Sequence, residues 1–155
     1  MNAAILNIGN ELLQGFTVNT NATWLARELT THSIEVNEIL VIKDDVGCIV
    51  NTIKTMIAGD YDYIFVTGGL GPTHDDITRD AISSAFNSSS HLDGIHNKYG
   101  TADGVYVEFE NSKFFFLPGV PREFKQMVVD EIIPKHFKKI KNVNGIITFN
   151  TFKIF

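Results

Sequence analysis

Residues 63–80, YIFVTGGLGPTHDDITRD, limit the possible folds of this chain more than any other segment. The apolar and β-branched residues 64–67 predict a buried strand, and the glycines and the proline that follow predict a tight turn into a helix. Glycine lets backbone N–H groups approach a phosphate without a Cβ in the way, and a helix N-terminus adds about 0.5 of a positive charge. The segment therefore predicts an anion site where the strand ends.

Two carboxylates, Asp75 and Asp76, stand inside this turn. They would repel a phosphate, so we expect a divalent cation such as Mg²⁺, Mn²⁺ or Co²⁺ to be held between them and the ligand. The structural alternative is that one Asp caps the next helix and that Thr78 lies in its first turn. Taken as a whole, the segment favours ligand binding. The residues expected to contact phosphate here are Thr67, Gly68, Gly69, Gly71, Pro72, Thr73 and Thr78, with His74 as a secondary candidate.

Length and composition describe one globular domain. The chain has 155 residues, of which 44% are hydrophobic, enough for a substantial core. Eighteen acidic and 13 basic residues give a formal charge of −5, which argues against nucleic acid or a membrane surface as the partner. The single Cys48, the lack of a signal-peptide pattern and the lack of an apolar run near ~20 residues predict a cytoplasmic protein.

The remaining elements are typical of an α/β domain. Residues 3–8 and 35–42 predict strands, and each is followed by an apolar stripe at helical spacing. Residues 104–117 predict a β-hairpin with its turn at Asn111 and Ser112, whereas the polar residues 87–100 predict a loop. We therefore expect a single three-layer α/β/α domain over residues 1–155, with a mostly parallel sheet and the hairpin at its edge. The alternation over residues 146–155 predicts a last strand that stops at the final residue, so we expect the domain to be either excised from a longer chain or a short stand-alone form.

Helix capping is the structural explanation for several polar residues. Thr20 or Asn21 is expected to cap the first long helix, and Asp44 or Asp45 the second. Ligands of open α/β sheets bind beyond the carboxyl ends of strands, so Asn10 and Glu11, just after the first strand, are placed to reach a ligand.

A second glycine turn, at residues 118–121, precedes another helix. We expect Pro118, Gly119 and Pro121 to face the first turn across a diphosphate, and Arg122 to offer it a charged fork. The alternative for Arg122 is an exposed helix face. The histidines of the predicted loop, His91 and His96, lack the neighbours of a metal site.

The motif GGLGPTHDDIT resembles the signature of the MoaB/Mog superfamily, a domain shared by molybdopterin-binding proteins and by the N-terminal half of CinA-type proteins. Its GPT-x-DD-x-T form is the CinA version. Three further segments match the family: Gly9-Asn10-Glu11-Leu12-Leu13 followed by Gly15, the pair Asp44-Asp45, and residues 117–127, LPGVPREFKQM. The resemblance covers nearly the whole chain, and the family's usual insertion is abbreviated at residues 87–104.

The resemblance implies roles for several of these residues. Asp44 and Asp76 match two acidic positions tied to catalysis, so we expect them to be catalytic and, with Asp75, to hold the metal. Gly9, Asn10 and Glu11 are expected to contact the ligand. The implied activity is divalent-metal-dependent hydrolysis of a nucleotide diphosphate such as ADP-ribose.

Two other functions remain open. The first is a molybdopterin-binding module of molybdenum cofactor biosynthesis without hydrolase activity, and the second is a unit used only for assembly. The family forms dimers or trimers, and the Phe-rich hairpin offers an apolar surface, so we expect a homo-oligomer.

Overall fold

The computed structural model describes residues 1–70, 75–87 and 90–137. The side chains of Asp75 and Asp76 lie outside this description. The predicted turn residues Gly71, Pro72, Thr73 and His74, and the predicted strand at 146–155, are also outside it.

A six-stranded sheet forms the centre of the domain, in the order β2-β1-β3-β6-β5-β4. The first four of these strands are parallel, and β5 and β4 are antiparallel additions. The predicted mostly parallel sheet is therefore confirmed, and the carboxyl ends of β1, β3 and β6 meet at one side of it. The strands are β1 (Asn2–Ile8), β2 (Glu35–Ile42), β3 (Tyr63–Thr67), β4 (His91–Ile95), β5 (Gly104–Phe109) and β6 (Ser112–Leu117).

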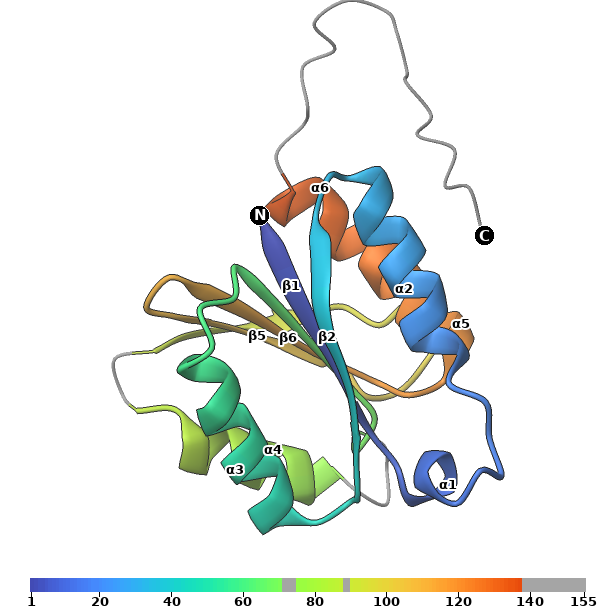
Figure 1. The fold of residues 1–155 in the computed structure, drawn as a ribbon, viewed down its shortest axis with the longest axis vertical. Helices are drawn as coiled ribbons and strands as arrows, with labels where there is room; N and C mark the ends of the chain where they lie inside the picture. Colours follow the sequence, from blue (N-terminus) through green and yellow to red (C-terminus); the bar gives the residue numbers. More distant parts are fainter. Residues whose placement is uncertain (71–74, 88–89, 138–155) are drawn as a thin grey trace, which may run out of the picture.

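Helices cover both faces of the sheet and complete the three layers (Figure 1). Helices α2, α5 and α6 pack on one face, and α3 and α4 pack on the other. The short α1 follows β1 directly at the carboxyl end of the sheet. The helices are α1 (Asn10–Leu13), α2 (Thr20–Thr31), α3 (Val46–Ile57), α4 (Asp75–Ala85), α5 (Pro121–Met127), the π-helix η1 (Val128–Ile132) and α6 (Ile133–His136).

The Phe-rich strand β6 lies inside the sheet, between β3 and β5. Successive side chains of a strand point to opposite faces, so Phe114 and Phe116 enter the α3–α4 layer while Phe115 enters the α2–α5 layer. All three rings are fully buried. The prediction that this arm is covered on both faces is confirmed, but the suggestion that it offers a surface to a neighbouring subunit is wrong.

The edge of the sheet differs from the prediction. On the antiparallel side of the sheet the edge is formed by β4, which pairs with β5, and not by the 104–117 hairpin, while β2 forms the opposite edge. The prediction of a loop over residues 87–100 is therefore wrong for β4. Only Ile95 of this strand is buried, so backbone pairing defines it in place of apolar alternation. The hairpin turn also lies one residue earlier than predicted, because Ser112 already pairs with Phe109.

At the start of both α2 and α3, one of several neighbouring polar residues caps the helix. Asn19 caps α2 by accepting a hydrogen bond from the Ala22 N–H at 3.3 Å, so neither Thr20 nor Asn21 is the cap. Asp45 caps α3 by accepting from the Cys48 N–H at 2.9 Å. Asp44, just before the cap, is therefore not used as the cap of α3.

The helical segment after β6 widens into a π-helix between α5 and α6. Here the Ile133 N–H donates to the Val128 carbonyl, five residues back. Pro134 explains this local widening, because its ring would clash with the carbonyl of Asp130 in a regular α-helix.

Candidate functional site

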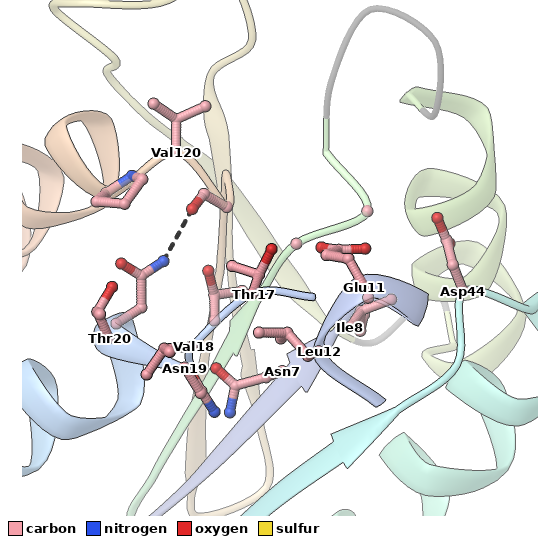
Figure 2. Close-up of a pocket in the computed structure, with 17 residues that line it drawn as sticks. Asn7, Ile8, Glu11, Leu12, Thr17, Val18, Asn19, Thr20, Asp44 and Val120 are labelled. Carbon is pink, nitrogen blue, oxygen red and sulfur yellow. Dashed lines mark hydrogen bonds between the residues drawn. The ribbon is translucent and has the colours of Figure 1, made fainter. Parts of the chain in front are cut away.

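A cleft of about 360 Å³ opens at the carboxyl ends of β1 and β3, between α1, the start of α2 and the start of α5 (Figure 2). This is the position at which open α/β sheets bind ligands. Of the predicted site residues, eight line the cleft: Gly9, Glu11, Asp44, Thr67, Gly68, Gly69, Gly119 and Pro121. The other lining residues are Asn7, Ile8, Leu12, Thr17, Val18, Asn19, Thr20, Asn21 and Val120.

The first turn requires glycine, because other atoms of the chain lie too close to Gly68 and Gly69 to leave room for a Cβ. Gly68 has φ +95°, and a Cβ there would lie 2.1 Å from the Ile8 carbonyl oxygen. Gly69 has φ +69°, and a Cβ there would lie 2.4 Å from Oγ1 of Thr78. The Gly68 N–H already donates to the Leu117 carbonyl at 3.1 Å, so this amide is not available to a phosphate as the sequence suggested. The turn brings the ends of β1 and β3 together.

Thr78 and Pro118 do not line the cleft, but each is hydrogen-bonded to a residue that does. The Thr78 hydroxyl is fully buried and donates to the Gly69 carbonyl at 2.8 Å. The Thr67 hydroxyl donates to the Pro118 carbonyl at 3.2 Å and joins the two glycine turns. A Cβ added to Gly119 would lie 3.5 Å from Cα of Gly68, and the Gly68 N–H donates to the Leu117 carbonyl, so the two turns lie against each other.

One end of the cleft is acidic. The side chains of Glu11 and Asp44 lie there, one from α1 and one from the loop after β2 (Figure 2). Asn10 holds this loop in place, because its Oδ1 accepts a hydrogen bond from the Asp44 N–H at 3.2 Å. Asn10 itself does not line the cleft. Among the described residues that line the cleft there is no Lys, Arg or His.

Arg122 lies away from the cleft. Its guanidinium stacks over the Tyr99 ring, with Cζ 4.0 Å from the ring centroid. The loop carrying Tyr99 is fastened to α5 by Asn97, whose Nδ2 donates to the Glu123 carboxylate at 2.8 Å. The predicted charged fork is therefore not formed by Arg122 in this structure.

The donor set of the cleft fits a divalent cation shared with a ligand. Mg²⁺ sites commonly use one or two carboxylates together with phosphate oxygens, and Glu11 and Asp44 are two such carboxylates in the cleft. Within the described residues no group of three or more His, Cys, Asp or Glu side chains could hold a metal alone. Phosphate oxygens of a ligand would have to complete the coordination.

Sequence reasoning missed the wall of the cleft formed by residues 17–21. This wall includes the exposed Val18 and the buried Asn21. It also missed Asn7, a fully buried asparagine within β1. A polar residue inside an otherwise apolar strand, in the sequence AAILNI, was the available signal for Asn7.

Within the described residues, no helix is long and apolar enough to cross a membrane.

Residues 4–138 match the protein family described as "Probable molybdopterin binding domain". The match covers most of the chain, so the protein belongs to this family, and the predicted MoaB/Mog resemblance is confirmed.

Two individual relatives show how much of each chain is shared. Protein PH0439 of Pyrococcus horikoshii is 32% identical, over 86% of this chain and 68% of its own length. A CinA-like protein of Flavobacterium psychrophilum is also 32% identical, over 90% of this chain but only 41% of its own length. This chain therefore corresponds to less than half of that relative.

Solved structures agree with the fold. CinA of Thermoplasma acidophilum superposes with a TM-score of 0.74 at 28% identity, covering 83% of this chain and 94% of that chain. The molybdopterin biosynthesis enzyme MoaB of Thermus thermophilus superposes with a TM-score of 0.70 over 82% of this chain and 86% of that chain. At 16% identity, the likeness to MoaB supports the fold alone.

Proposed function

We propose that the cleft binds a phosphate-bearing ligand of the molybdopterin type. The observation that carries this proposal is a cleft of about 360 Å³ between two touching glycine turns, in a domain of the molybdopterin-binding family. Small-molecule sites generally enclose ~300–1,000 Å³, so the cleft has room for one such ligand.

A second candidate function is metal-dependent hydrolysis of a nucleotide diphosphate such as ADP-ribose. The charge of the cleft favours it, because the described residues that line the cleft include Glu11 and Asp44 but no Lys, Arg or His. In this proposal Asp44, with Asp75 and Asp76 at the start of α4, holds a Mg²⁺, Mn²⁺ or Co²⁺ ion against the ligand. Such an ion neutralises phosphate charge and lowers the pKa of a bound water.

The two candidates are separated by their need for a cation. Each carboxylate opposes a nearby phosphate by about 1 kcal/mol at ~4 Å even in bulk-water screening. We expect calorimetry to show that ADP-ribose binds more tightly with metal and that it is converted to AMP and ribose 5-phosphate. Binding of molybdopterin without any conversion of ADP-ribose by any of the three metals would reject the hydrolase and retain the binding module.

A pair of adjacent variants tests the role of Asp44. D44N removes one carboxylate from the cleft, whereas D45N removes the same charge one residue later and keeps a good helix cap. With Mg²⁺ present, D44N should lose binding or turnover and D45N should not. Without metal, D44N should bind pyrophosphate about fivefold more tightly, which corresponds to ~1 kcal/mol. Equal behaviour of the two variants would exclude Asp44 from the site.

Asp76→Asn tests the second acidic position that the resemblance assigns. We expect it to abolish metal-dependent turnover while the melting temperature stays within a few degrees of wild type. Loss of ~1 kcal/mol of stability with unchanged turnover would instead identify Asp76 as a helix cap.

We also propose that the protein is a homo-oligomer, either a dimer or a trimer. The basis is the family resemblance, since the Phe-rich surface first considered is buried. Light scattering at high concentration should give a mass that is a multiple of 17.3 kDa, and a particle of 17.3 kDa at all concentrations would refute it.

A further inference from the structure

A second cavity lies at the other end of the domain from the cleft. It encloses about 330 Å³ between the antiparallel part of the sheet, β4 to β6, and the segment formed by η1 and α6. Helices α1 and α6 lie at opposite ends of the molecule (Figure 1), and the cleft and this cavity share no lining residue. We call it the α6 cavity, and its charged lining residues are Asp93, Glu108, Lys113, Glu131 and Lys135.

Strand alternation assembles the floor of the α6 cavity. His91, Glu108 and Lys113 lie directly opposite one another on the three strands, and Asp93 lies opposite Tyr106 in the next row. Residues two apart on a strand point to the same face of a sheet, so both rows lie on the face that α6 covers. The floor therefore brings one ammonium and two carboxylate groups together on one face.

The register predicts an ion pair for Lys113 that the structure does not contain. Glu108 is its direct cross-strand neighbour, and opposite charges in such positions normally stabilise each other. Glu108 instead accepts a hydrogen bond from the Tyr106 hydroxyl at 2.9 Å. Burial raises the pKa of Tyr106, so this hydroxyl stays protonated and donates. The half-buried Lys113 consequently makes no ion pair with any carboxylate of the described residues.

Asp93 is the second charge without an opposite charge beside it. Its Oδ1 accepts a hydrogen bond from the Gly94 N–H at 2.8 Å, and within the described part of the chain it forms no ion pair. Across the cavity, Lys135 and Glu131 pair with each other. The α6 cavity therefore offers a positive group at Lys113 and a negative group at Asp93.

These two groups select the charge of a ligand. Asp93 would repel a simple anion drawn to Lys113, and Lys113 would repel a simple cation drawn to Asp93, whereas a molecule with both charges gains at both places. Between them lie the rings of Tyr106 and His136, whose centroids are 4.5 Å apart. Burial lowers the pKa of His136, so its ring is neutral at pH 7 and suits a carbon chain laid across it.

Strand geometry sets the length of that chain. Neighbouring strands are about 4.8 Å apart, and two residues along a strand span about 6.7 Å. Lys113 lies two strands and one such step from Asp93, so their Cα atoms are roughly 12 Å apart. An α-amino acid carries both charges on one carbon and is too short to span the two side chains. An amino acid whose charges stand at opposite ends of a short chain fits better.

We propose that the α6 cavity binds an ω-amino acid. Lys113 holds its carboxylate, Asp93 holds its ammonium group, and its methylene groups lie across the rings of Tyr106 and His136. This site is separate from the cleft and does not depend on the function proposed for the cleft.

Nuclear magnetic resonance on the full chain at pH 7 tests the proposal. The probes are 5-aminopentanoate, its two singly charged analogues pentanoate and pentylamine, and glycine, each titrated separately while assigned amide signals are followed. We expect 5-aminopentanoate to shift the signals of Asp93, Tyr106 and Lys113 and to leave that of Gly69 in the cleft unchanged. It should bind about fivefold more tightly than each of the other three probes, the effect of one additional charge pair.

Two variants assign the ends of the ligand. K113Q keeps the length of the side chain, and D93N keeps an oxygen that can accept from the Gly94 N–H, so both should fold. K113Q should bind 5-aminopentanoate no more tightly than pentylamine, and D93N should bind it no more tightly than pentanoate. The matched controls are K54Q on α3 and D80N on α4, which change exposed residues outside the cavity and should keep the preference of the wild type.

Three results would overturn the proposal. These are equal affinities for 5-aminopentanoate and its singly charged analogues, an unaltered preference in K113Q or D93N, and the lack of a saturable shift with any probe. Shifts of Asp44 and Gly69 in place of Asp93 and Lys113 would also reject it, because they would put the ligand in the cleft. None of these results bears on the binding of phosphate ligands, so the function proposed for the cleft is tested separately.

Discussion

Replacing Gly68 by alanine should be among the most damaging single changes to this domain. An L-residue at φ +95° carries a strain of about 1–2 kcal/mol. The new Cβ would also lie 2.1 Å from the Ile8 carbonyl oxygen, which belongs to backbone and cannot swing aside. Forcing such an overlap into a packed region adds about 1–3 kcal/mol. We therefore expect G68A to lose about 2–5 kcal/mol of a total stability of ~5–15 kcal/mol.

Two other glycines provide matched controls. Gly15 has φ +76°, but a Cβ there would meet nothing within 4 Å, so G15A isolates the backbone strain and should cost about 1 kcal/mol. Gly119 lies outside the left-handed region, and its Cβ would make only ordinary contact at 3.5 Å. G119A should therefore stay within about 1 kcal/mol of wild type, with the lower entropy of the unfolded chain as a small gain.

Urea unfolding at 25 °C and thermal unfolding, both followed by circular dichroism, measure all three variants. The expected order of stability is G119A, then G15A, then G68A, with G68A melting roughly 4–20 °C below wild type at ~2–4 °C per kcal/mol. If G68A proves no less stable than G15A to within about 0.5 kcal/mol, the contact with Ile8 does not constrain the turn.

Three further predictions concern other parts of the fold. D45A should lose ~1 kcal/mol of unfolding free energy through the α3 cap, leave ligand binding intact, and be rescued by D45N. N97A should lower the free energy of unfolding by at least about 2 kcal/mol, because this asparagine is 4% exposed and the hydrogen bonds of its side-chain amide hold the 97–102 loop together and to α5. A smaller loss in urea unfolding would contradict that role. The pKa of His136 is lowered, first by burial of its ring and then by the positive charges of Lys113 and Lys135. Below pH ~6.5 the unfolded chain therefore binds a proton at this histidine more readily than the native chain does. The free energy of unfolding consequently falls as the pH falls. H136Q should flatten this dependence between pH 8 and pH 5, as judged from urea midpoints, and an unchanged slope would contradict the assignment.

The parallel core was predictable because its signals are local. Each buried strand is a short apolar run, and each is followed by a helical stripe, so the pattern alone indicates the layers. The glycine turn at Gly68 was equally visible. Strand β4 was not, because four of its five residues are exposed and its pairing with β5 depends on contacts distant in sequence.

The site was only partly predictable for the same reason. Asp44 and Glu11 follow strands directly, so the topology places them in the cleft. The direction of Arg122 depends on Tyr99, and the burial of Asn21 depends on the Gly119 carbonyl 98 residues away. Neither of these contacts can be predicted from the residues next to Arg122 or Asn21 in the sequence. Oδ1 of Asn7 and Oδ1 of Asn21 have no hydrogen-bond partner among the described residues, which became apparent only when their hydrogen bonds were accounted for one by one.

The cleft is assembled from segments that span residues 7 to 121, and this has a thermodynamic consequence. Because α1, β3 and the α5 turn meet only in the complete sheet, a ligand that binds there binds the native state and not the unfolded chain. Mass action then adds about 2.7 kcal/mol of stability at a free ligand concentration of ~100 Kd. Every strand of the sheet would share this gain as slower global hydrogen exchange. A thermal-shift screen of pterins, nucleotides and metals would thus detect the physiological ligand class through the stability of the whole domain, without an activity assay.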